Sequence, residues 1–148
     1  MSTPISILLN QKGSRIISVL PSASVADAVR VMIQHRVGSV VVLEDGRMTG
    51  IFTERDMLNR VAVSGRTPES IRVEEVMTRH PLTVRPETGV EQVMALFTDR
   101  RCRHLPVVDE SSGSPVLTGM ISIGDVTRWL LESYSAETEN LRRYIGAS

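Results

Sequence analysis

Two short segments of this sequence combine a hydroxyl group with a carboxylate three residues later. Thr53–Asp56 follows the apolar segment Gly50–Phe52, and Ser122–Asp125 follows Gly119–Ile121. At the start of a helix, such a hydroxyl accepts a hydrogen bond from a backbone N–H group, and an acid at the third helical position suits the positive helix end. Each segment is therefore expected to cap a helix that begins where a strand ends.

The same residue types can also bind the sugar of a nucleotide. A carboxylate can accept both hydrogens of a ribose diol, the hydroxyl adds a third contact, and the N–H groups of the helix end favour a nearby phosphate. Capping and sugar binding are compatible, so both interpretations stay open for Thr53 with Asp56 and for Ser122 with Asp125. Because the pattern occurs twice, any site that it builds is expected to occur twice.

The elements that would position these pairs also occur twice and in the same order. Each copy is expected to form a strand, a helix, two strands joined by a turn, and a second helix. The first copy opens with an apolar strand at 16–19 and the second with one at 81–84, and the turn-rich stretch 110–115 lengthens the second copy. The sequence therefore predicts an α/β fold of two β-α-β-β-α repeats related by a pseudo-twofold axis, followed by a C-terminal helix.

Turn residues and apolar periodicity set the expected boundaries. We expect a first repeat with the N-terminal segment at 1–64, a linker at 65–72, a second repeat at 73–133 and a C-terminal helical tail at 134–148. In the tail, Leu141 and Ile145 interrupt a polar pattern, which predicts docking on the body or on another subunit. Pro106 falls inside a predicted strand and is expected where its missing N–H group faces no partner.

Composition narrows the range of partners and locations. The chain has 148 residues, 41% of them hydrophobic, which is enough for a core. Its 17 basic and 17 acidic residues cancel and only 3% are aromatic, so nucleic acid and anionic membranes are disfavoured partners. The single Cys102 cannot form an internal disulfide, and the N-terminal apolar run has no basic start and is too short for a membrane span. A cytoplasmic location is expected.

With these motifs in this order, the chain resembles a tandem pair of cystathionine-β-synthase (CBS) domains, the Bateman module. The resemblance rests on segments 34–42, 50–56, 103–109 and 119–125 and covers about residues 12–133. It is strongest for small stand-alone bacterial CBS-pair proteins without an attached enzyme or transporter. It implies a non-catalytic regulatory module that needs no cofactor, binds AMP, ADP, ATP or NAD as a regulatory ligand between the repeats, and signals to a partner protein.

The resemblance also implies which residues surround the ligand. Around Ser122 and Asp125, the first cleft would contain Met120, Ile17, Gly38, Ser39 and Val40. Around Thr53 and Asp56, the second cleft would contain Ile51, Leu82, Arg103, His104 and Leu105. The basic residues expected near phosphates are Lys12, Arg55, Arg101 and Arg103.

The two clefts are not expected to bind equally well. Gly38 and Ser39 leave room for a base, whereas Arg103 and His104 put bulk and charge at the corresponding place. The cleft at Ser122 and Asp125 is therefore expected to be the better adenosine site.

Three other functions compete with nucleotide sensing. A dimeric scaffold with empty clefts remains the main alternative. An enzyme is disfavoured because the sequence shows no nucleophile–base set and no phosphate-binding loop, and a metal site at Cys102, His104 and His80 lacks a fourth ligand. The resemblance also implies a homodimer that associates through apolar helix faces, for which the candidates are Met32, Phe97, Trp129 and Leu130.

Overall fold

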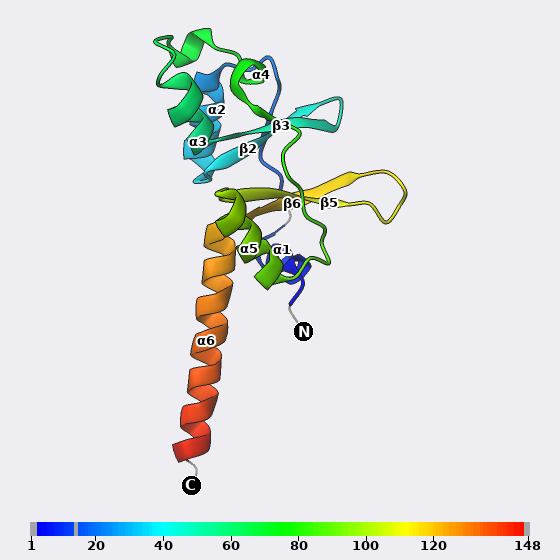
Figure 1. The fold of residues 1–148 in the computed structure, drawn as a ribbon, viewed down its shortest axis with the longest axis vertical. Coiled ribbons are helices and arrows are strands. Elements are labelled where there is room, and N and C mark those ends of the chain that lie inside the picture. The colour runs from blue at the N-terminus through cyan, green and yellow to red at the C-terminus, as the bar shows by residue number, and fades with distance from the viewer. Residues whose placement is uncertain (1–2, 14, 147–148) are drawn as a thin grey trace.

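The computed structural model describes residues 3–13 and 15–146, which form two α/β halves and a long C-terminal helix (Figure 1). The first half contains β1 (Ser18–Val19), α2 (Val25–His35), β2 (Ser39–Glu44), β3 (Arg47–Thr53) and α3 (Glu54–Asp56). The second half contains α5 (Val90–Arg100), β5 (His104–Asp109), β6 (Val116–Ser122) and α6 (Ile123–Gly146). The predicted α/β fold of two repeats with a C-terminal helix is confirmed.

Local sequence signals explain the elements of the first half. The Ser24 side chain accepts a hydrogen bond of 3.0 Å from the N–H group of Asp27 and so starts α2. Asp45 and Gly46 both have positive φ angles, 51° and 76°, as a two-residue hairpin turn between β2 and β3 requires. After α3, the backbone continues through a π-helical turn at Met57–Val61.

Pro106 explains why the second half lacks one strand that the sequence predicts. In the first half, β1 pairs in parallel with β2, and the Val41 N–H group donates to the Ile17 carbonyl at 3.0 Å. Pro106 occupies the place of Val41 in β5 and has no N–H group to donate. The expected strand 81–84 is therefore reduced to a single parallel bridge between Val84 and Val107, while β5 pairs antiparallel with β6.

The two halves exchange their entry segments. Helix α1 (Ile5–Lys12) packs into the core of the second half, where Ile5, Leu8 and Leu9 are buried. Helix α4 (Val73–Val76) packs into the core of the first half, and β4 (Thr78–Arg79) joins the sheet of that half beside β3. Packing thus joins residues 5–12 to the core of the second half and residues 73–79 to the first half, while the repeat boundaries expected from the sequence stay predictions.

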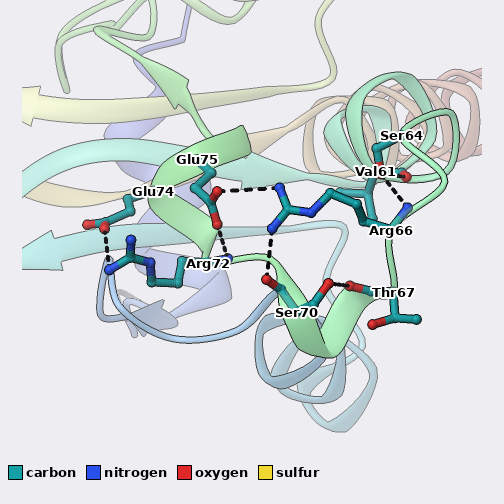
Figure 2. Close-up of polar contacts among 8 residues, drawn as sticks. All are labelled: Val61, Ser64, Arg66, Thr67, Ser70, Arg72, Glu74 and Glu75. Atoms are coloured by element: carbon teal, nitrogen blue, oxygen red, sulfur yellow. Dashed lines mark hydrogen bonds and ion pairs between the residues drawn. The ribbon is translucent and has the colours of Figure 1, made fainter.

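Side-chain contacts fix the linker between the repeats to the start of α4 (Figure 2). The Arg66 guanidinium donates to the Ser70 carbonyl at 2.9 Å and lies 3.4 Å from a carboxylate oxygen of Glu75. Glu75 also accepts a bond of 2.7 Å from the Arg72 N–H group, which lowers the pKa of its carboxyl group. These contacts tie the 3₁₀ turn Pro68–Ser70 to the start of α4.

Helix α6 runs without a break from Ile123 to Gly146 and extends away from the body (Figure 1). The expected tail at 134–148 is the end of this helix and not a separate element, and its last two residues lie outside the described part of the chain. Tyr134 and Leu141 are 70% and 60% exposed, so these two side chains do not pack on the body, and the other expectation, docking on another subunit, stays a prediction. Within the described residues, no helix is both long and apolar enough to cross a membrane.

Two of the four expected dimer residues are not available at the surface. Met32 and Phe97 are buried in the cores of the first and second halves. Trp129 is partly buried against the second core, and Leu130 is 42% exposed. Met32 and Phe97 were wrongly assigned because a helix stripe that faces the chain's own core has the same apolar spacing as one that faces a partner.

Candidate functional site: two clefts between the repeats

Two clefts lie where the repeats meet, one at each hydroxyl–acid pair. The Thr53 cleft has a volume of about 550 Å³ and is lined by residues of α3 and of β5, among others. The Ser122 cleft has a volume of about 360 Å³ and is lined by residues of β2 and of α6, among others. Each cleft therefore takes its walls from both repeats.

In the Thr53 cleft, the acid is fully engaged by the protein itself. Asp56 is only 6% exposed. Its Oδ2 accepts hydrogen bonds from the N–H and hydroxyl groups of Thr53 at 3.0 and 3.2 Å, and its Oδ1 accepts one from the Thr78 hydroxyl at 3.0 Å. Arg60 Nε adds an ion-pair contact to Oδ1 at 3.8 Å. The carboxylate is thus a buried helix cap with both oxygens occupied.

In the Ser122 cleft, the corresponding acid is only partly engaged. Asp125 Oδ2 accepts bonds from the Ser122 N–H group at 2.9 Å and from Lys12 Nζ at 2.8 Å, and Lys12 Nζ also donates to the Met120 carbonyl at 3.0 Å. The Asp125 N–H group returns a bond to Ser122 Oγ at 3.2 Å. Both donors converge on Oδ2, so among the described contacts Oδ1 remains able to accept a hydrogen bond from a ligand.

The structure brings the expected residues together with one exception. Every residue expected in the Thr53 cleft lines it, and Arg55, Arg101 and Arg103 line it too. The residues that line the Ser122 cleft as expected are Lys12, Ile17, Gly38, Ser39, Met120, Ser122 and Asp125. Val40 is buried in the first core, and Val41 lines the cleft in its place. Alternate side chains of a strand face the same side, which puts Val41 and not Val40 beside Ser39.

Sequence reasoning missed several basic residues at the clefts. Arg15, Arg36 and Arg128 line the Ser122 cleft, and Arg100 lines the Thr53 cleft. Arg128 lies one helical turn after Asp125, a spacing that points to the same helix face. Arg15 and Arg36 carry no comparable local signal, because their position depends on how the repeats pack.

The relative sizes of the two clefts are not those expected from the bulk of Arg103 and His104. The Thr53 cleft is the larger one, although Arg103 and His104 line it. Bulk at these positions therefore does not close the cleft. In this structure, the distinction between the clefts lies in the acid, because Asp56 has both oxygens occupied and Asp125 does not.

His104 lines both clefts and lies against Gly38. A Cβ atom at Gly38 would lie 2.9 Å from His104 Nε2 of the other repeat and 2.8 Å from Glu54 Oε1 of its own repeat, so these side chains would have to shift to admit it. Burial is the main cause that lowers the pKa of His104, and the nearby Glu54 carboxylate opposes this effect. The imidazole is thus held in a mostly desolvated position between the two clefts.

Cys102 has no sign of metal binding or activation. Burial raises the pKa of its thiol. Its Sγ lies 3.9 Å from the Leu96 carbonyl, and it packs against the second core. Among the residues that the structure describes, no group of three or more His, Cys, Asp or Glu side chains could hold a metal ion.

The comparisons with known proteins agree with this arrangement. The family model described as CBS domain matches residues 12–63 and 73–132. The mitochondrial CBS domain-containing protein CBSX3 of Arabidopsis thaliana is 42% identical over 127 residues, which cover 82% of this chain and 60% of that protein.

Solved structures share the fold over most of the chain. The CBS-domain protein ATU1752 of Agrobacterium tumefaciens has a TM-score of 0.78 at 36% identity and covers 85% of this chain and 98% of its own. The CBS domain pair of protein MJ0100, solved with 5′-methylthioadenosine and S-adenosyl-L-methionine, has a TM-score of 0.75 at 22% identity and covers 90% and 99%.

Proposed function

This chain belongs to the CBS-domain family, and on that premise we propose that it is a non-catalytic regulatory module that binds an adenosine-containing nucleotide between its repeats. AMP, ADP, ATP and NAD are the proposed ligands. The observation that carries the proposal is the Ser122 cleft, where an acid with one oxygen that accepts no bond from the described residues lies opposite small and apolar residues of the other repeat.

The residues of the Ser122 cleft suit the three parts of a nucleotide. Asp125 Oδ1 would accept from a ribose hydroxyl, and the Ser122 hydroxyl would add a contact. The base would lie beside Ile17 and the backbone at Gly38, where no side chain blocks its approach. The phosphates would meet the guanidinium groups that line the same cleft, from Arg15, Arg36 and Arg128.

The Thr53 cleft is proposed as a second, weaker nucleotide site. Its four arginines, Arg55, Arg100, Arg101 and Arg103, suit a phosphate-rich ligand. A ribose at Asp56 would have to displace the Thr78 hydroxyl or share its oxygen. We therefore expect phosphate contacts to contribute more in this cleft than sugar contacts do.

Binding between the repeats provides a physical route to regulation. A ligand that contacts both walls of a cleft stabilises the arrangement of the repeats that fits it best, by the difference in its affinity for the alternatives. We propose that a partner protein reads this shift and that the module acts as a homodimer. The ligands of MJ0100 both contain adenosine, and the proposal extends that ligand class to this chain, whose likeness to MJ0100 concerns the fold.

Thermal unfolding with a panel of nucleotides tests the proposal. A ligand that binds only the folded protein stabilises it by RT ln(1 + [L]/Kd), so millimolar AMP, ADP, ATP or NAD should raise Tm. Guanosine nucleotides test the base, and 2′,3′-dideoxyadenosine monophosphate tests the diol contact. Calorimetric titration of the dideoxy compound should show much weaker binding than AMP in the Ser122 cleft.

The result also separates nucleotide sensing from the main alternative. If none of the adenosine compounds changes Tm or gives heat on titration, the clefts are empty and the chain is better described as a dimeric scaffold. Equal binding of AMP and its dideoxy analogue would reject the role assigned to Asp125 while leaving nucleotide binding itself in place.

A further inference from the structure

Helix α6 carries an apolar stripe that its own chain leaves exposed. Near its start, Val126 is fully buried and Trp129 partly buried against the second core. Farther along, Leu131, Tyr134 and Leu141 are 63%, 70% and 60% exposed. This part of the helix extends beyond the body (Figure 1).

Side chains on this part of the helix follow the spacing of a coiled coil. Four exposed side chains, Leu131, Tyr134, Leu141 and Ile145, and the half-buried Thr138 recur along α6 at alternating intervals of three and four residues. This is the spacing of the two core positions, a and d, of a heptad repeat, which meet along a seam between two helices. Leu131 lies five residues after the buried Val126, about 140° around the helix. The seam therefore faces away from the chain's own body.

The charges beside the seam favour a second copy in parallel orientation. With Leu131 at position a, Glu137 falls at g and Arg142 at e. In a parallel pair, g of one helix faces the following e of the other, so Glu137 meets Arg142 twice across the seam. An antiparallel pair sets g opposite g and e opposite e, so it does not bring Glu137 to Arg142 in this way. On the outer face, Glu139 and Arg143 lie 4.0 Å apart within one helix, as expected for solvent-exposed positions.

We propose that the C-terminal half of α6 forms a parallel, two-stranded coiled coil with α6 of a second copy of this chain. The polar residue in the seam is compatible with burial, because the Thr138 hydroxyl donates to the Tyr134 carbonyl at 2.9 Å. A helix segment of this length with most of its apolar side chains exposed is only marginally stable in water, and a partner helix supplies further burial. The proposal concerns assembly and is independent of nucleotide binding.

Disulfide crosslinking of single-cysteine variants tests both the seam and its orientation. In a Cys102→Ser background, we expect Leu141→Cys and, independently, Tyr134→Cys to form intermolecular disulfides on mild oxidation, because a parallel seam brings each residue next to its own copy. Ala136→Cys, on the outer face of the same helix, is the matched control and should remain monomeric on a non-reducing gel. Equal crosslinking at Ala136 and Leu141, or none at either seam residue, would overturn the proposal.

A second measurement addresses affinity. Leu141→Asp puts a carboxylate into the seam, whereas Asn140→Asp adds the same charge to the neighbouring position outside it. By sedimentation velocity, Leu141→Asp should weaken self-association on the order of 100-fold and Asn140→Asp should leave it nearly unchanged. If the wild-type protein is monomeric at high micromolar concentration, pairing with a second copy is refuted. This holds even if α6 then proves to bind another protein or lipid vesicles.

Discussion

Replacing the two cleft aspartates one at a time should separate helix capping from ligand binding. The pairs look alike in sequence, but Asp56 receives contacts from Thr53, Thr78 and Arg60, whereas Asp125 receives them from Ser122 and Lys12. We therefore expect Asp56→Ala mainly to destabilise the fold and Asp125→Ala mainly to weaken nucleotide binding.

The expected cost in stability follows from the groups left without a partner. Asp56→Ala removes a helix cap, which costs about 0.5–2 kcal/mol, and leaves the part-buried Thr78 hydroxyl unpaired, which adds about 1–3 kcal/mol. Together these give about 1.5–5 kcal/mol. Asp125→Ala also removes a cap, but Lys12 still donates to the Met120 carbonyl. The Lys12 side chain is 36% exposed, so water can replace the carboxylate that it loses. We expect a cost of about 1 kcal/mol there.

The expected cost in binding has the opposite order. Losing a hydrogen bond between a ligand and a charged group costs about 1.5–3 kcal/mol, which is a roughly 10- to 150-fold weaker Kd for Asp125→Ala. Urea unfolding at constant m-value measures the stability of both variants, and calorimetry measures their affinity for AMP. If Asp125→Ala destabilises the protein as much as Asp56→Ala and binds AMP like the wild type, the acid is only a cap and the proposed sugar contact is wrong.

Three further predictions concern the contact between the repeats and the response to acid. Gly38→Ala should destabilise by about 1–3 kcal/mol in urea and weaken AMP binding, because a Cβ atom would displace His104, whereas Gly46→Asn in the hairpin turn should leave AMP binding unchanged. Folding lowers the pKa of His104, so on acidification this histidine is protonated in the unfolded chain before it is protonated in the folded one. The stability of the wild type should therefore fall as the pH drops below about 6.5. Over the same range, Tm of His104→Gln should fall less than Tm of the wild type. Folding also lowers the pKa of Glu75, so the stabilisation that its carboxylate provides should be present above the ordinary carboxyl pKa and lost in acid. Below about pH 4.5, the urea midpoint of Glu75→Gln should therefore depend less on pH than that of the wild type.

Local signals account for most elements of the fold. The Ser24 cap, the Asp45-Gly46 turn and the β-branched run in β2 each act within a few residues, and signals of this kind are visible in the sequence alone. The missing strand in the second half is partly predictable, since a proline such as Pro106 does not fit inside a strand. Its effect on residues 81–84 depends on which segment would pair with β5, and the sequence does not show this.

Long-range packing was the part that the sequence did not reveal. The exchange of α1 and α4 between the cores depends on contacts between segments far apart in the chain, and no local pattern distinguishes the two possible cores. Lys12 was expected near a phosphate, yet its Nζ lies on the Asp125 carboxylate because α1 packs on the second half. Likewise, an apolar helix position such as Phe97 faces the core or a partner according to packing that only the structure defines.

The exchanged segments also explain why two equivalent motifs form unequal sites. Each acid is bonded by a residue from the segment that enters its repeat: Thr78 near α4 for Asp56, and Lys12 at the end of α1 for Asp125. Thr78 occupies the oxygen that a sugar would need, whereas Lys12 shares Oδ2 with the Ser122 N–H group and leaves Oδ1 to accept. If this difference governs ligand choice, then Thr78→Val should free Asp56 Oδ1 and strengthen AMP binding in the Thr53 cleft at some cost in stability. Titration of Thr78→Val in the Asp125→Ala background isolates that cleft, and unchanged or weaker binding there would show that the entry segments do not set the difference between the sites.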